Sequence, residues 1–138
     1  MKPDGDIQFD RDLILVVDDD RDFVDAVVNS LGADLPSAKF LTAGDGQACL
    51  SVYKESNPKP GIIILDMMLP GKSGFLVLQD LEKAGQDNAP PVVIMVTGNQ
   101  GARHKVYAKS LGTFRYLNKP FRMQRLLEVV QDARSRIS

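Results

Sequence analysis

The sequence predicts an α/β fold in which a parallel sheet of five strands carries helices on both faces. Three observations lead to this fold class. Short apolar runs alternate with segments whose apolar residues recur with the period of a helix. Three of the runs are apolar throughout, as expected for strands that are buried on both faces of a sheet. Residues that favour turns, glycine and proline among them, separate the segments.

The first half of the chain contains two predicted strands and two predicted helices. A polar leader over residues 1–11 precedes the apolar run Leu13–Val17. A helix follows, because the apolar residues between Phe23 and Leu31 share one helical face. Lys39–Ala43 is a weaker strand, and the next helix begins at Asp45-Gly46.

The third strand and the helix after it occupy the middle of the chain. The loop SNPKPG leads into the apolar run Ile62–Asp66. Ser73 is suited to cap the following helix, because its hydroxyl can accept a hydrogen bond from a free backbone N–H. The apolar positions that would face inward from this helix are Val77, Leu78, Leu81 and Ala84.

The last third of the chain contains two more strands and two more helices. Val92–Thr97 is strongly apolar, whereas the helix expected around residues 101–111 has a poor apolar pattern. Thr113–Leu117 is a mixed strand. The final helix is the clearest, because Met123 and the apolar residues after it follow the helical period.

Polar residues within two of the strands indicate the order of the sheet. Lys39 and Thr42 lie in the second strand, and Thr113 and Arg115 lie in the fifth. Strands that tolerate polar side chains are best placed at the edges. This places the second and fifth strands outside and predicts the order 2-1-3-4-5, the doubly wound (βα)5 arrangement called flavodoxin-like.

Composition sets the limits on function. Of the 138 residues, 43% are hydrophobic and 25% are charged, and 17 basic side chains nearly balance 18 acidic ones. This balance does not indicate binding to nucleic acid or to a membrane. Cys49 is the single cysteine, which excludes a disulfide framework and suggests the cytoplasm. We expect one domain over residues 12–138 after the leader, with no signal peptide.

Acidic residues follow the two central strands. Parallel strands in such a sheet place their carboxyl ends at one rim, where ligands bind. Asp18, Asp19 and Asp20 follow the first strand, and Asp66 ends the third. Asp20 is expected mainly to cap the next helix. Thr97-Gly98 and Lys119-Pro120 reach the same rim from the last two strands.

A cluster of carboxylates at this rim predicts a metal site. Close carboxylates repel one another, and a hard divalent cation relieves the repulsion. Mg²⁺ suits a shallow site with oxygen ligands because it keeps several of its waters. A metal, a lysine and a hydroxyl donor together can handle a phosphoryl group, and the carboxylate of Asp66 is the candidate nucleophile.

Four segments carry a resemblance to a known family. They are LILVVDD (13–19), IIILDMMLPGKSG (62–74), VIMVTG (93–98) and YLNKPF (116–121). In this order and at these separations they resemble the receiver domains of response regulators in two-component signalling. The resemblance covers the chain from about residue 12 to its end.

The resemblance implies a role for each matching residue. Asp66 would be the phosphoacceptor, and Asp18 and Asp19 would hold Mg²⁺, or Mn²⁺ as an alternative, together with Asp66 and the backbone carbonyl of Met68. Lys119, Thr97 and Gly98 would contact the phosphoryl group. Thr97 and Tyr116 would form the switch, and the peptide bond between Lys119 and Pro120 would be cis.

The resemblance also implies partners. A sensor histidine kinase or a histidine phosphotransfer protein would supply the phosphoryl group, and a small acyl phosphate could replace it. The face made by the fourth helix, fifth strand and fifth helix would then bind an unknown output protein or effector domain. Whether phosphorylation produces a dimer is left open. The domain would not act as an enzyme on other substrates.

Three alternatives stay open at this stage. A haloacid-dehalogenase-like phosphohydrolase also uses an Asp nucleophile with Mg²⁺, but it has a second acid two residues later, where this chain has Met68. A flavodoxin-type binding module shares the sheet order, but the acidic loop DDDRDF lacks the small residues that cradle a phosphate. A degenerate receiver that serves only as a scaffold is disfavoured because every site position is present.

Overall fold

The computed structural model describes residues 8–81, 90–98 and 113–137. The strands are β1 Phe9–Val17, β2 Lys39–Ala43, β3 Lys59–Asp66, β4 Val92–Thr97 and β5 Arg115–Asn118. The helices are α1 Arg21–Asp34, α2 Gly46–Glu55, α3 Gly74–Asp80 and α5 Met123–Ser135. The helix expected around residues 101–111, and Ala84 of the preceding helix, lie outside the described residues.

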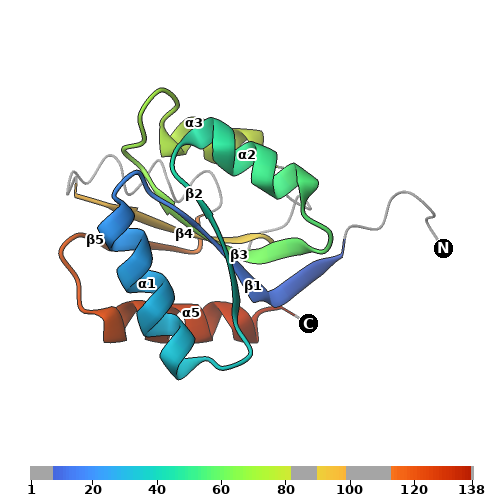
Figure 1. The fold of residues 1–138 in the computed structure, drawn as a ribbon, viewed down its shortest axis with the longest axis vertical. Coiled ribbons are helices and arrows are strands. Elements are labelled where there is room, and N and C mark those ends of the chain that lie inside the picture. Colours follow the sequence, from blue (N-terminus) through green and yellow to red (C-terminus); the bar gives the residue numbers. More distant parts are fainter. Residues whose placement is uncertain (1–7, 82–89, 99–112, 138) are drawn as a thin grey trace.

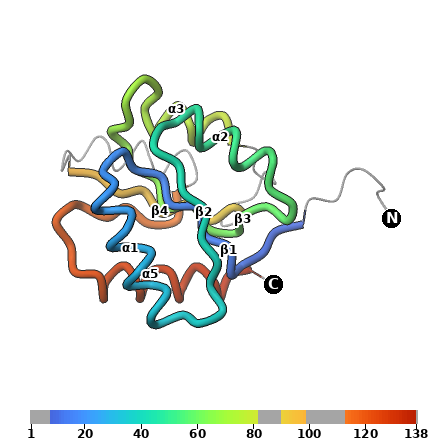
Figure 2. The backbone as a smooth tube through the Cα atoms, viewed as in Figure 1, coloured from blue at the N-terminus to red at the C-terminus, as the bar shows by residue number. Residues whose placement is uncertain are grey.

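The sheet lies between two layers of helices. Its strands are all parallel and follow the order β2-β1-β3-β4-β5, which confirms the predicted fold class and topology. Helices α1 and α5 cover one face, and α2 and α3 cover the other (Figure 1). The backbone trace shows α1 and α5 beside one another (Figure 2).

The sheet divides the apolar core into two clusters. Ile14, Ile64 and Ile94 point toward α1 and α5. Their chain neighbours Leu15 and Leu65 point toward α2 and α3. Side chains alternate along a strand, so burial on both faces explains why these runs are apolar throughout.

Strand β1 is longer than predicted. It begins at Phe9 rather than Leu13, because Phe9 and Asp10 pair with the start of β3, and the register shifts between Asp10 and Ile14. The polar residues ahead of Leu13 concealed this extension. Gly61 makes room for it, since a Cβ at this position would lie 2.7 Å from the carbonyl oxygen of Asp10. The division into leader and domain at residue 12 stays a prediction.

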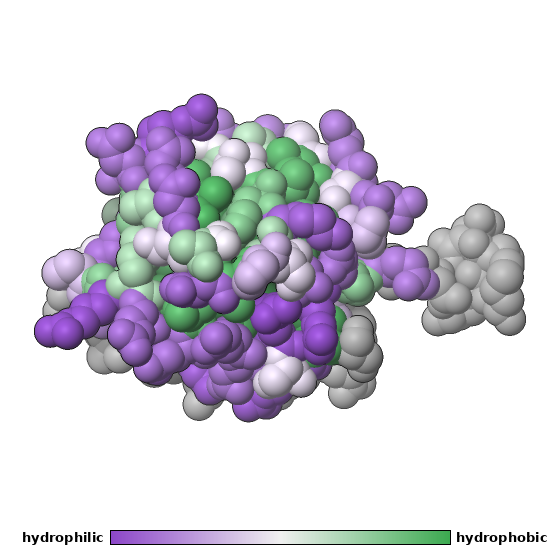
Figure 3. All heavy atoms as spheres, turned by 60° about the horizontal axis from the view of Figure 1, so that its bottom comes forward, coloured by the Kyte–Doolittle hydropathy of each residue, from purple (hydrophilic) through white to green (hydrophobic). Residues whose placement is uncertain are grey.

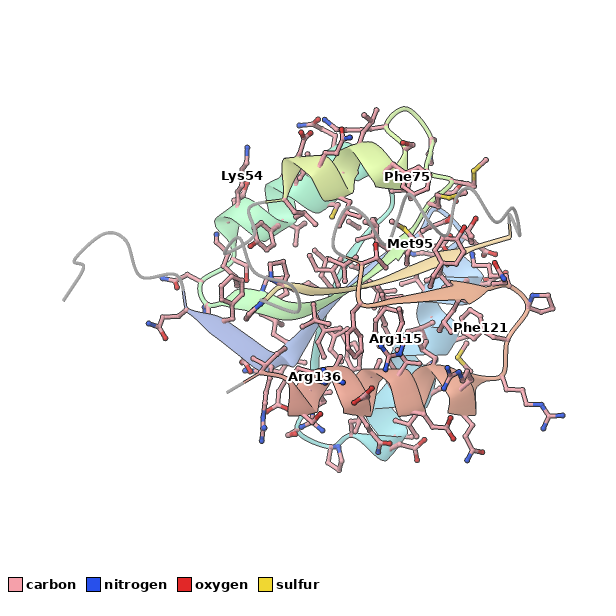
Figure 4. All side chains as sticks on the ribbon, turned by 180° about the vertical axis from the view of Figure 1, so that it is seen from behind. Lys54, Phe75, Met95, Arg115, Phe121 and Arg136 are labelled. Atoms are coloured by element: carbon pink, nitrogen blue, oxygen red, sulfur yellow. The ribbon has the colours of Figure 1, made fainter. Side chains whose placement is uncertain are left out.

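The fifth strand also differs from its expected bounds. It runs over Arg115–Asn118 rather than Thr113–Leu117. Residues 115–118 pair with residues 94–97 of β4, so the hydrogen-bonding partner rather than the apolar pattern sets the bounds. Figure 4 shows the two sides of this edge, with Met95 on the side of α3 and Arg115 on the side of α5.

Side chains cap three of the described helices, two of them as predicted from the sequence. The carboxylate of Asp20 accepts hydrogen bonds from the backbone N–H groups of Asp22 and Phe23 at the start of α1. Ser73 caps α3 through the N–H of Leu76, which confirms that prediction, and Asp45 caps α2.

Hydrophilic side chains cover much of the face on which α1 and α5 lie (Figure 3). Within the described ranges, no helix has the length and apolar character needed to cross a membrane.

Candidate functional site at the carboxyl rim of the sheet

Three carboxylates from two adjacent strands meet at the rim. Asp18 and Asp19 directly follow β1, and Asp66 is the last residue of β3. One carboxylate oxygen from each lies within 4.8 Å of the others. Asp18 and Asp66 are 3% and 6% exposed, while Asp19 is open to solvent. The predicted acidic cluster therefore has two buried members and one exposed member.

Asp18 is held on both of its carboxylate oxygens. Oδ1 accepts a hydrogen bond from the backbone N–H of Asp20 at 2.9 Å. Oδ2 lies 2.7 Å from the ammonium nitrogen of Lys119, which reaches it from the loop after β5. The Asp18 side chain is only 2% exposed, so solvent screens this ion pair weakly.

Asp66 is an acid in an environment that disfavours its charge. Burial is the main cause that raises its pKa, and the negative charges of Asp18 and Asp19 raise it further. A hydrogen bond from the N–H of Met68, 3.0 Å from Oδ1, and the charge of Lys119 act in the opposite direction. The balance is a raised pKa, which a cation placed between the carboxylates would lower again.

The loop after β3 is closed tightly around Asp66. The N–H of Gly74 donates a hydrogen bond to the carbonyl of Met67 at 2.8 Å. A Cβ on residue 74 would lie only 2.4 Å from the backbone oxygen of Asp66. Gly71 within the same loop has a φ of 77°, a conformation that glycine adopts without strain. The motif LPGKSG thus uses its glycines to bring the loop back against the acid.

Gly74→Ala is expected to lower the free energy of unfolding by about 1–3 kcal/mol, because the new methyl group would overlap backbone atoms that cannot move aside. Urea denaturation would measure the change. Gly44→Ala is the matched control, since a Cβ at residue 44 would meet no atom within 4 Å. Equal midpoints for the two variants would contradict the close approach at residue 74.

The last two strands bring the other predicted residues to the same rim. Thr97 is fully buried at the end of β4, and its carbonyl accepts a hydrogen bond from the N–H of Lys119 at 2.7 Å. A Cβ at Gly98 would meet no atom of the described residues within 4 Å. The peptide bond between Lys119 and Pro120 is cis.

Tyr116 lies on β5 beside Met95 of β4, on the α2 and α3 side of the sheet. Its hydroxyl lies 3.6 Å from the sulfur of Met67, and the ring is half-buried. Met68, two residues after Asp66, is 61% exposed. Its carbonyl stays a predicted metal ligand.

Phe23 is a residue of the site that sequence reasoning did not find. Its spacing placed it on the buried face of the first helix. The structure confirms that it packs against the core, but also shows the ammonium of Lys119 4.1 Å from the centre of its ring. The sequence feature that could have indicated this role is the position of Phe23 about one helical turn after Asp19 and Asp20.

Comparison with known proteins decides the family. The model of the response regulator receiver domain matches residues 14–131. The chain belongs to this family. Receiver domains are signalling domains rather than classical enzymes, and the predicted resemblance is confirmed.

Individual relatives agree with this assignment. The chain is 32% identical over 114 residues to the transcriptional regulatory protein CpxR of Klebsiella pneumoniae, covering 83% of this chain and 45% of that protein. It is 33% identical over 92 residues to protein PilH of Pseudomonas aeruginosa, covering 67% and 71%. This receiver domain thus spans less than half the length of CpxR and most of PilH.

Solved structures match the fold closely. A receiver domain from Clostridium thermocellum superimposes with a TM-score of 0.78 at 28% identity, covering 90% of this chain and 94% of that one. A CheY-like receiver domain from Methanospirillum hungatei gives the same TM-score of 0.78 at 22% identity, covering 94% and 95%. The second likeness concerns the fold alone.

Proposed function

We propose that this receiver domain accepts a phosphoryl group on Asp66 from a histidine kinase, a histidine phosphotransfer protein or a small acyl phosphate. The observation that supports the proposal best is the joint position of three carboxylates and one ammonium group at the rim. A nucleophilic carboxylate, an acidic pair and a fixed cation are the groups that phosphoryl transfer to an acid requires.

The donor set fits a hard divalent cation. The three side chains offer only oxygen atoms, they already lie within reach of one ion, and their mutual repulsion favours binding of positive charge. Asp18, Asp19, Asp66 and the carbonyl of Met68 would hold Mg²⁺, with Mn²⁺ as the alternative. When bound, the ion would neutralise charge on the phosphoryl oxygens.

The transfer exchanges one bond to phosphorus for another. A carboxylate oxygen of Asp66 forms an O–P bond while the N–P bond of the phosphohistidine breaks. The electron pair of the broken bond stays on the imidazole nitrogen, which takes a proton from solvent. Lys119, the Thr97 hydroxyl and Gly98 would contact the phosphoryl oxygens.

The product would carry a dianionic group at a site that is already acidic. Thr97 would move toward it, and Tyr116 would turn inward, repacking the face made by the fourth helix, β5 and α5 for an output partner. Dimer formation stays open, and the cytoplasmic location stays a prediction. Unchanged amide exchange on this face after phosphorylation would contradict the switch.

Intact-mass spectrometry after incubation with acetyl phosphate or phosphoramidate tests the proposal. We expect one phosphoryl adduct that forms with Mg²⁺ and disappears when EDTA removes the metal. Asp20→Asn should still form the adduct and serves as the control for removal of a nearby carboxylate. Asparagine caps a helix as well as aspartate does, and Asp20 lies outside the acidic cluster. A folded protein that forms no adduct with Mg²⁺ or Mn²⁺ would contradict the proposal.

A further inference from the structure

Among the residues that the structure describes, two of different kinds lie beside the ammonium group of Lys119. One is the carboxylate of Asp18, whose Oδ2 lies 2.7 Å from Nζ. The other is the ring of Phe23, whose centre lies 4.1 Å from the same nitrogen. This separation is well inside the range at which the negative face of an aromatic ring attracts a cation. The Lys119 side chain is 26% exposed, so water only partly competes with both contacts.

The ring of Phe23 is itself held in place. Its backbone N–H donates to the carboxylate of Asp20 at 3.2 Å in the first turn of α1. Phe121, two residues after Lys119, meets the ring edge to face, with centres 6.0 Å apart and planes at 89°. Figure 4 shows Phe121 where the chain passes from β5 to α5. The segment that carries the lysine therefore also braces the aromatic ring beneath it.

The ion pair between Lys119 and Asp18 cannot persist throughout the proposed reaction. Asp18 is a candidate metal ligand, and Lys119 is the candidate partner of the phosphoryl group. The lysine must then give up the carboxylate that holds it in this structure. An ionic hydrogen bond is directional and is lost when its acceptor turns away. A ring face has no single acceptor atom, so it keeps attracting the ammonium while the ionic partner changes.

We propose that Phe23 is a positioning residue of the phosphoryl-transfer site, whose ring face keeps the ammonium of Lys119 at the rim while its ionic partner changes from Asp18 to the phosphoryl group. This inference rests on the proposed function. It assigns to an aromatic residue of α1 a role beyond packing. Packing alone would be satisfied by any side chain of similar size and hydrophobicity.

Fluorinated phenylalanine at position 23 separates the two roles. Each added fluorine withdraws charge from the ring face and leaves the ring apolar and nearly unchanged in shape. With saturating Mg²⁺, we expect the rate of phosphorylation by phosphoramidate to fall stepwise from mono- to trifluorophenylalanine. The overall loss should be about threefold or more, the factor that a weakened cation–π contact implies. Phe23→Leu should show a similar loss, and Phe23→Tyr should retain the rate.

The same fluorine series at Phe40 is the matched control, because this residue packs against the same core cluster but belongs to strand β2 rather than to helix α1. A second readout needs neither metal nor phosphodonor: the side-chain CH₂ protons next to Nζ of Lys119 should be shifted upfield by the Phe23 ring, and Phe23→Leu should abolish that shift. A phosphorylation rate unaffected by fluorination at 23, in a protein that is otherwise phosphorylated, overturns this inference alone. Absence of phosphorylation in the unsubstituted protein overturns the proposed function and the inference with it.

Discussion

Asp66→Asn is expected to give no phosphoryl adduct and, at neutral pH, a folded protein more stable than the unsubstituted one. The amide oxygen is too weak a nucleophile to attack phosphorus, so the loss of phosphorylation should be complete. The gain in stability has a separate cause. Asp66 is 6% exposed, and both burial and the charges of Asp18 and Asp19 disfavour its ionised form. A neutral side chain of the same shape avoids that cost and can still accept the N–H of Met68.

The difference in stability should depend on pH in one direction. The pKa of Asp66 is raised above the usual 3.8, so the folded protein holds this proton more tightly than the unfolded chain does. The destabilising charge is fully present above the raised pKa and is absent well below 3.8. Denaturation curves of the two proteins should therefore converge as the pH falls through this window.

Asp45→Asn is the control for this comparison, because Asp45 caps α2 and asparagine can do the same. It should leave both the adduct and the pH dependence unchanged. A lower stability of Asp66→Asn at neutral pH would show that the acid is held by favourable contacts and not merely by its place at the end of β3.

Lys119→Met is expected to slow phosphorylation by about 10²–10³-fold, the loss typical when one preorganised charge-stabilising donor is removed. The methionine keeps an apolar side chain of similar length and removes the ammonium group that contacts Asp18 and Phe23. The rate of adduct formation from acetyl phosphate, followed by intact mass, measures the effect. Binding of Mg²⁺ should persist or tighten, because the three carboxylates would have lost the cation that now compensates them.

Lys39→Met is the matched control for this variant. Lys39 also forms an ion pair, with Asp10, but at the opposite end of β1 and with 63% of its side chain exposed. Its removal should leave phosphorylation unchanged. A loss of Mg²⁺ binding in Lys119→Met would instead indicate that the lysine organises the acidic cluster, and the slower transfer would follow from the missing metal.

Much of the fold could be predicted because burial on both faces leaves a clear apolar pattern. Three central runs and the order of the sheet followed from the contrast between apolar strands and the polar residues Lys39 and Arg115. The start of β1 at Phe9 could not be predicted in this way. Its pairing with β3 depends on backbone hydrogen bonds and on space at Gly61, which involve no apolar repeat.

The acidic cluster could be predicted because parallel strands end at a common rim, so position along the chain translates directly into position in space. The Lys119 ammonium could be placed at that rim by the same reasoning, although its bond to Asp18 could not. The apolar pattern predicted Phe23 only as a core residue. A helical period reports which face of α1 is buried, and it does not report that a lysine from a loop 96 residues later would lie over the ring.

The sheet also separates the protein into two halves that can vary independently. Ile64 and Leu65 are neighbours in β3, yet they pack into clusters on opposite sides of a hydrogen-bonded backbone layer. Substitutions in groups without shared contacts usually act additively. Substitutions in the cluster beneath α2 and α3, against which Tyr116 packs, are therefore expected to leave the packing around Phe23 on the other side of the sheet unchanged. A core divided in this way would let the packing around Tyr116 change without disturbing the packing around Phe23.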